Sequence, residues 1–156
     1  MLEVEVFGAG QLGSRGPSLV EMRRLCRAAA SAAGVCDGHV AIAFVDESRI
    51  ARLNREHRAQ DRPTDVLSFP IDGVDPVDGQ GTIGGRGAAV DERSHAHTSH
   101  HGVQRELGDV VICPEHTVDL REAIVHGMLH LLGMDHEVDD GEMLALQRLL
   151  LADDRR

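Results

Sequence analysis

Residues 126 to 136 read HGMLHLLGMDH, which places three imidazoles at the spacing H-x-x-x-H-x-x-G-x-x-H. On a helix, His126 and His130 are four positions apart and share one face. Gly133 can adopt the left-handed conformation that ends a helix, which turns the chain back and brings His136 toward the same ion. Three neutral ligands leave a fourth tetrahedral position for water, as in catalytic zinc sites. The segment therefore predicts a metal-binding helix followed by a turn.

The residue after the first histidine separates two kinds of hydrolase. In zinc peptidases of related spacing this residue is a glutamate that acts as general base, whereas here it is Gly127. The peptidase signature is therefore missing, and we expect Gly127→Glu to place negative charge beside the metal and to impair hydrolysis. Asp135 could orient a ligand imidazole, accept a proton or only cap the turn, and the sequence does not decide between these roles.

The composition indicates one globular domain. The chain has 156 residues, of which 42% are hydrophobic, and this is enough for a sizeable core. No apolar run approaches the roughly 18 residues of a membrane span, and the first residues lack a signal-peptide pattern. We therefore expect a cytoplasmic protein with no membrane partner. Cys26, Cys36 and Cys113 are few and widely spaced, which is typical of reduced thiols.

The charge distribution points to a local phosphate site. A formal net charge of -10 argues against a general nucleic-acid coat, because nonspecific affinity comes from neutralised phosphates. All basic residues are nonetheless arginines, whose planar fork suits phosphate, and five of them lie between Arg49 and Arg62. A solvated helix face is the alternative explanation for this cluster. With three Phe and no Trp or Tyr, base stacking is scarce, so we expect recognition of a nucleic-acid backbone.

Hydrophobic periodicity predicts alternating strands and helices. Apolar runs predict strands over residues 2–7, 39–45, 65–69 and 107–113. Helices are expected from the capping box of Ser18 and Glu21, from Asp46 to about His57, from about Val118, and over about 139–152. Helical spacing in the last helix predicts a core stripe of Met143, Leu146, Leu149 and Leu150.

The periodic pattern is lost between Asp72 and Glu106. This stretch is rich in glycine, has few large apolar residues and carries a histidine cluster at 94–101. It is longer than the loops that compact domains usually contain. We therefore predict a disordered insertion at 72–106, in which the histidine cluster has nothing to hold it in one geometry.

Three blocks of the sequence resemble the YbeY family of bacterial endoribonucleases. HGMLHLLGMDH looks like the family signature H-G-x-L-H-L-x-G-[YM]-D-H. Residues 53–58 and 61–70 resemble its L-N-x-x-[YF]-R-x-x-D-x-P-T-D-V-L-S-F-P block, and residues 107–112 resemble its L-G-D-[IV]-x-[IL] strand. Together the blocks span most of residues 40 to 150, which is far more specific than a zinc-binding spacing alone.

The resemblance implies a single α+β domain over residues 1–156, with a mixed four-stranded sheet packed by helices. It implies one catalytic zinc per chain held by His126, His130 and His136, and it assigns the family's cleft arginine to Arg58. The implied function is zinc-dependent cleavage of single-stranded RNA in small-subunit rRNA maturation and ribosome quality control. The implied partners are the rRNA precursor and the small ribosomal subunit, while the oligomeric state stays open. The alternatives are a zinc peptidase or other metallohydrolase, and a ribosome-assembly factor with a structural zinc.

The chain departs from the family pattern at three places. His57 stands where the family usually has an aromatic residue, residues 114–124 are shorter than its usual helix, and residues 72–106 are longer than its usual loop. These departures affect the outer wall of the expected cleft and leave the predicted metal ligands unchanged.

Overall fold

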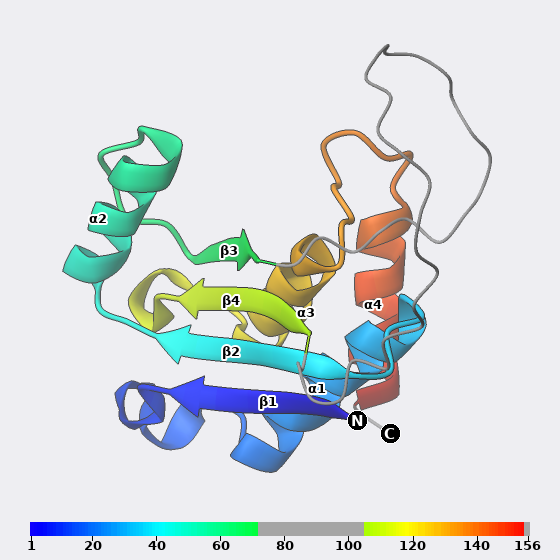
Figure 1. Ribbon diagram of the computed structural model, residues 1–156. Coiled ribbons are helices and arrows are strands. Elements are labelled where there is room, and N and C mark those ends of the chain that lie inside the picture. The colour runs from blue at the N-terminus through cyan, green and yellow to red at the C-terminus, as the bar shows by residue number, and fades with distance from the viewer. Residues whose placement is uncertain (72–104, 155–156) are drawn as a thin grey trace, which may run out of the picture.

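Four strands form one mixed sheet in the computed structural model, which describes residues 1–71 and 105–154 (Figure 1). Across the sheet the strands follow the order β1 (Leu2–Phe7), β2 (Gly38–Phe44), β4 (Glu106–Ile112) and β3 (Val66–Pro70). β2 pairs in parallel with both β1 and β4, and β3 pairs antiparallel with β4. The predicted α+β class with a mixed four-stranded sheet is confirmed.

Helices pack on one face of this sheet and at one end of it. The helical elements are η1 (Ala9–Arg15), α1 (Leu19–Ala32), α2 (Glu47–Arg58), η2 (Pro114–His116), α3 (Leu120–Leu131) and α4 (Glu142–Asp154). Contacts join α1 to α3, α3 to β3 and β4, and α4 to both α1 and α3, while α2 lies apart from these three helices (Figure 1). The main core therefore lies between the sheet and the α1, α3 and α4 layer.

Strand residues alternate between this core and the opposite face, as the period of two requires. Val40 and Ile42 of β2 and Val110 and Ile112 of β4 are fully buried, and they belong to the same core cluster as Met128 of α3. A second, smaller cluster holds Ile50, Leu67 and Cys113, with Leu53 packed against it. The α2 helix therefore rests on its own small core through Ile50 and Leu53.

Local capping explains where the first two long helices begin. The hydroxyl of Ser18 accepts a hydrogen bond from the Glu21 amide, and the Glu21 carboxylate accepts one from the Ser18 amide, both at 3.2 Å. This confirms the predicted capping box. Asp46 caps α2 by accepting from the Arg49 amide at 2.8 Å. The same helix ends at Ala59, whose φ of 54° is left-handed, a conformation that costs a residue with a side chain about 1 kcal/mol.

Two predictions about helices are corrected. The helix expected from about Val118 begins at Leu120, because the Asp119 carboxylate caps it by accepting from the Arg121 and Glu122 amides. In α4 the predicted core position Leu149 is 65% exposed. The helix buries Met143, as predicted, together with Gln147, which is four positions further on and shares its face, whereas Leu149 is turned about 200° from Gln147.

The predicted insertion at 72–106, including the histidine cluster, lies outside the described residues except for its last two positions. Of these, Glu106 already belongs to β4. No helix in the two described segments is long and apolar enough to cross a membrane. All three cysteines are free, as predicted, with Cys36 exposed. Burial raises the pKa of Cys26 to about 12, so this thiol is unreactive near neutral pH.

Candidate functional site

The α3 helix and the turn after it bring together the three histidines singled out by the sequence. His126 and His130 lie one turn apart on α3, with their Nε2 atoms 3.2 Å from each other. Gly133 follows the helix with φ of 87°, as predicted for its end, and the chain then returns to His136. One nitrogen from each ring lies within 4.8 Å of the others, and all three side chains are half-buried. This group could hold a metal ion.

The electrostatics of the group favour the neutral form of His130. Burial lowers the pKa of His130, and the neighbouring His126 and His136 lower it further. A histidine must be neutral at the nitrogen that binds a metal, and a lowered pKa keeps His130 in that form near pH 7. The geometry and the protonation state therefore agree.

Gly127 lies on the part of α3 that packs against the sheet. A Cβ atom at this position would come within 2.4 Å of Val110 Cγ1 and 3.2 Å of Val66 Cγ2, and the Gly127 carbonyl accepts a hydrogen bond from the Ser68 hydroxyl at 2.9 Å. Glycine is needed here because α3 and the sheet approach so closely. A side chain there would first meet Val110 of β4 and Val66 of β3, while the expectation that Gly127→Glu places charge beside the metal stays a prediction.

His126 is also hydrogen-bonded on the side away from the other two histidines. Its Nδ1 lies 2.9 Å from Oε1 of Gln147 on α4, and Nε2 of Gln147 donates to Glu122 Oε1 at 3.1 Å. Gln147 was not predicted as a site residue, because it lies within an apolar helix. The sequence did contain one signal for its role. Gln147 is a polar residue four positions after Met143, so it lies on the helix face that was expected to be apolar.

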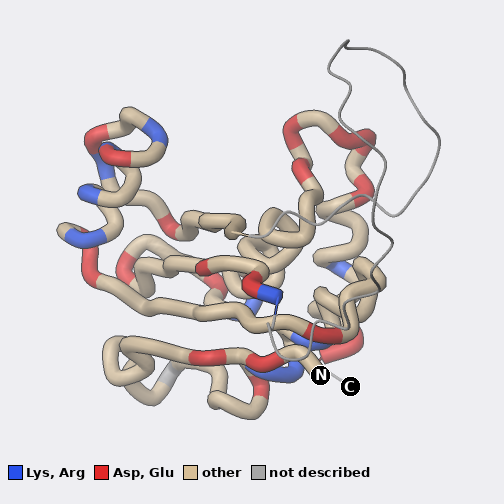
Figure 2. The backbone as a smooth tube through the Cα atoms, viewed as in Figure 1, with Lys and Arg blue, Asp and Glu red and all other residues tan. Residues whose placement is uncertain are grey.

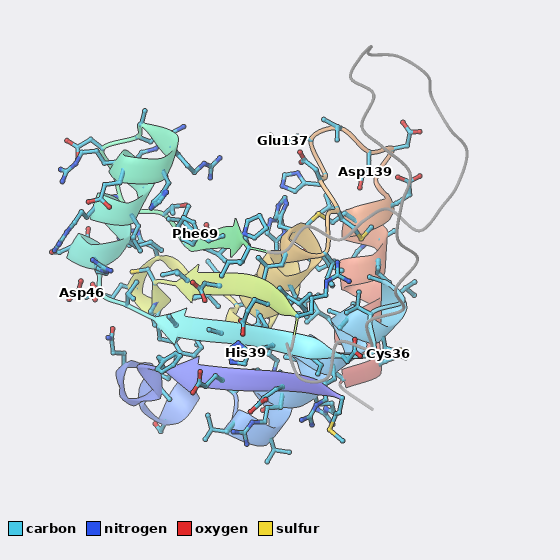
Figure 3. All side chains as sticks on the ribbon, viewed as in Figure 1. Cys36, His39, Asp46, Phe69, Glu137 and Asp139 are labelled. Atoms are coloured by element: carbon cyan, nitrogen blue, oxygen red, sulfur yellow. The ribbon has the colours of Figure 1, made fainter. Side chains whose placement is uncertain are left out.

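A cleft of about 670 Å³ runs along this group. Its walls come from the end of α2, from β3, from α3 and from the turn after α3. The lining residues are His57, Arg58, Thr64, Asp65, Val66, Leu67, Ser68, Phe69, Pro70, His126, His130, Asp135, His136 and Glu137. All five predicted site residues, namely Arg58, Asp135 and the three histidines, thus line one cleft. Figure 3 shows Phe69 on β3 and Glu137 on the turn after α3.

Arginines and acidic residues gather on different sides of this cleft. Figure 2 shows basic residues along α2 and mainly acidic residues on the segment between α3 and α4. Within the described segments, Arg55 pairs with Asp61 at 3.3 Å, whereas Arg58 is exposed and makes no ion pair. Of the five arginines between positions 49 and 62, Arg58 is the one that lines the cleft. It is therefore the best placed of the five to meet a phosphate.

Two further residues explain details of the cleft wall. The His57 ring packs edge-on against Phe69, with ring centroids 4.8 Å apart, so this histidine supplies an aromatic ring at a position where the resemblance implied one. Asp135 is half-buried, and its Oδ1 accepts a hydrogen bond from the Glu137 amide at 2.9 Å. Turn capping by Asp135 is therefore observed, and its role as a proton acceptor stays a prediction.

The chain is similar to known proteins over most of its length. A protein-family model described as "Endoribonuclease YbeY" matches residues 20–153. The chain is 34% identical to the endoribonuclease YbeY of Bacillus licheniformis over 148 residues, which cover 85% of this chain and 83% of that protein. It is 32% identical to the protein of the same name from Shouchella clausii, with coverage of 97% and 94%. Among solved structures, the solution structure of TM1509 from Thermotoga maritima is 24% identical, with coverage of 97% and 88% and a TM-score of 0.49.

Proposed function

The chain belongs to the YbeY endoribonuclease family, and from this premise we propose that it is a zinc-dependent enzyme that cuts single-stranded RNA during rRNA maturation. The observation that carries the proposal is the convergence of three half-buried imidazoles on a cleft that an exposed arginine also lines. The proposed substrate is the rRNA precursor within the small ribosomal subunit, in the cytoplasm, and the proposed roles include ribosome quality control.

The histidine group fits zinc in donor type and spacing. Zinc accepts nitrogen ligands in tetrahedral sites, where two nitrogens about 2.0–2.1 Å from the ion lie roughly 3.3 Å apart. The Nε2 atoms of His126 and His130 are 3.2 Å apart. The group contains no carboxylate or thiolate, so the ion would keep its full positive charge. His126, His130 and His136 are therefore the proposed ligands of one zinc per chain.

The proposed chemistry divides between the ion and the chain. When bound, zinc supplies a Lewis acid that activates water and polarises a phosphodiester oxygen. Arg58 holds the scissile phosphate and stabilises the negative charge that develops on it, a role for which its planar donor fork is suited. Asp135 accepts a proton from the attacking group through the carboxylate that lines the cleft. Asp135→Asn tests the last role cleanly, because asparagine keeps the oxygen that caps the turn and loses the charge.

The cleft favours recognition of the RNA backbone over the bases. Apart from the three histidines proposed as metal ligands, its described aromatic side chains are Phe69 and His57, which pack against each other. Few bases can stack on so small a surface. We therefore expect cleavage with little sequence preference.

An assay with three substrates tests the proposal. Purified protein is incubated with single-stranded RNA, duplex RNA and an unfolded protein, each with and without a zinc chelator. We expect cleavage of the single strand that stops on chelation and returns with added zinc. Proteolysis with RNA left intact would instead support a peptidase, and zinc binding without any cleavage would support an assembly factor with a structural zinc.

A further inference from the structure

Gln147 is a buried polar side chain on α4, at the interface of this helix with α3. It is 5% exposed, and in the described part of the chain Asn54 is the other polar residue classed as buried. A buried amide destabilises a protein unless its donor and acceptor groups both find partners. Gln147 has a partner at each end, His126 at its oxygen and Glu122 at its nitrogen.

The chemistry of the partners fixes the direction of this chain of hydrogen bonds. The Glu122 carboxylate only accepts, so the amide nitrogen of Gln147 must face it. The amide oxygen then faces His126 Nδ1 at 2.9 Å, and because that oxygen also only accepts, Nδ1 must carry a proton. A neutral imidazole with a proton on Nδ1 has a free lone pair on Nε2. This is the atom of His126 that lies 3.2 Å from His130 Nε2.

We propose that Gln147 is a positioning residue of the metal site, which fixes the ring orientation and the tautomer of His126 through the hydrogen-bonded series Glu122, Gln147, His126. This inference rests on the proposed zinc site. Gln147 touches neither substrate nor metal, and it acts through the ligand that it holds. Groups that orient a metal-binding histidine in this way commonly change metal affinity by tenfold to a hundredfold.

The first test replaces the amide with an apolar side chain of similar size. Zinc affinity of Gln147→Leu is measured by competition with a chelating dye, and the melting temperature is measured on zinc-free protein. We expect zinc binding to weaken at least tenfold while the zinc-free melting temperature is unchanged or higher. Leu149→Gln, on the exposed side of the same helix, is the matched control and should bind zinc normally.

The second test exchanges the two partners. In the double variant Glu122→Gln with Gln147→Glu, the carboxylate introduced at position 147 accepts a hydrogen bond from His126 Nδ1. The amide introduced at position 122 donates a hydrogen bond to that carboxylate, so the direction of the hydrogen bonds is kept. We expect zinc affinity within about threefold of the wild-type value, far from the loss expected for the leucine variant. Nitrogen NMR of the histidines should show a protonated Nδ1 on His126 in the wild type and the double variant, and mixed tautomers in Gln147→Leu.

The outcomes separate this inference from the proposed function. A wild-type protein that binds no zinc would overturn the zinc site itself. A wild-type protein that binds zinc, together with Gln147→Leu that binds it equally well, would overturn the positioning role alone. If Gln147→Leu does not fold, the same measurements are made on Glu122→Ala, which changes an exposed residue. Without the Glu122 carboxylate, the amide of Gln147 can rotate and no longer fixes the tautomer of His126. Unchanged zinc affinity and an unchanged His126 tautomer in that variant would also overturn the inference.

Discussion

The two helices that line the cleft hold their functional side chains in different ways. On α3, the side chains of His126 and His130 are half-buried and face each other, and the helix is packed into the main core. On α2, Arg58 is exposed at the last helical residue, and the helix rests on the separate small core of Ile50, Leu67 and Cys113. A metal requires fixed ligand positions, whereas a long cation can adjust to a moving phosphate. The α3 side of the cleft is therefore its rigid wall, held by the main core, and the α2 side is its adaptable wall.

The largest expected effect is at the rigid wall. His130→Ala removes one of three ligands, so the purified variant should lose its zinc and its RNA cleavage together. Elemental analysis of the variant and of the wild type, which we expect to hold about one zinc per chain, measures the first effect. An unchanged metal content in the variant would show that the ion binds elsewhere, and the α3 wall would then not be the wall that holds a metal.

The next effect concerns the packing beneath that wall. Gly127→Ala introduces a methyl group 2.4 Å from Val110 Cγ1, and overpacking of this kind costs about 1–3 kcal/mol. The better helix propensity of alanine returns at most about 1 kcal/mol, so we expect a lower free energy of unfolding and weaker zinc binding.

Denaturant unfolding and zinc competition measure these two quantities. Gly10→Ala is the matched control, because an added Cβ there meets no atom within 4 Å. A Gly127→Ala protein as stable as the wild type would show that α3 can shift without harm.

At the adaptable wall, we expect a substitution to lower the cleavage activity and to leave the fold unchanged. Arg58→Ala should lower kcat/KM for RNA at least tenfold, because a donor to the reacting phosphate is lost, while zinc content and melting temperature stay nearly unchanged. Arg52→Ala, on the same helix but outside the cleft lining, should cut RNA normally. Full activity in Arg58→Ala would show that this arginine is only part of a solvated helix face.

A smaller effect is expected at the end of the same helix. Ala59 adopts φ of 54°, which glycine adopts without the steric cost. The greater freedom of glycine in the unfolded chain offsets part of this gain, so Ala59→Gly should stabilise the protein by about 0.5 kcal/mol in denaturant unfolding. A destabilised variant would indicate that the side chain of Ala59 contributes packing that outweighs its strain.

The smallest effect is expected from shortening the chain between the two walls. Pro70 pairs with Gly108, and the Ile71 amide donates to the Leu107 carbonyl at 3.2 Å, so a short linker can replace residues 72–104 between adjacent strands. Loop closure depends weakly on length, by about 0.6 kcal/mol for each doubling. The deletion should therefore keep zinc content and melting temperature. Loss of either would show that the segment supports the site.

The features predicted from sequence are those that depend on neighbours along the chain. The apolar run of the strand predicted over 39–45, the Ser18 cap and the histidine spacing are all local, and all three were found as expected. The side of α4 that is buried depends on how the helix is rotated against α3, which no local pattern fixes. This is why Leu149 was misplaced and Gln147 was missed.

Gly127, within the histidine motif, is a second residue whose role could not be predicted from the local sequence. Its sequence position suggested a missing catalytic base, whereas its role follows from the short distance between α3 and the sheet. That distance is set by residues of β4 and β3, far away in the sequence. The clustering of the three histidines was therefore predictable, and the packing and hydrogen bonds around them were not.

The strand order also determines which parts of the protein can fold first during synthesis. The centre of the sheet pairs β2 with β4, and partners such as His39 and Glu106 are 67 positions apart. Long-range pairs of this kind form slowly, because the intervening chain must first be closed into a loop. The middle of the sheet cannot close until Ile112 has left the ribosome, and His126, His130 and His136 emerge later still. A nascent chain therefore lacks the proposed metal site until His136 has been translated, and we expect metal capture to be a late step of its maturation.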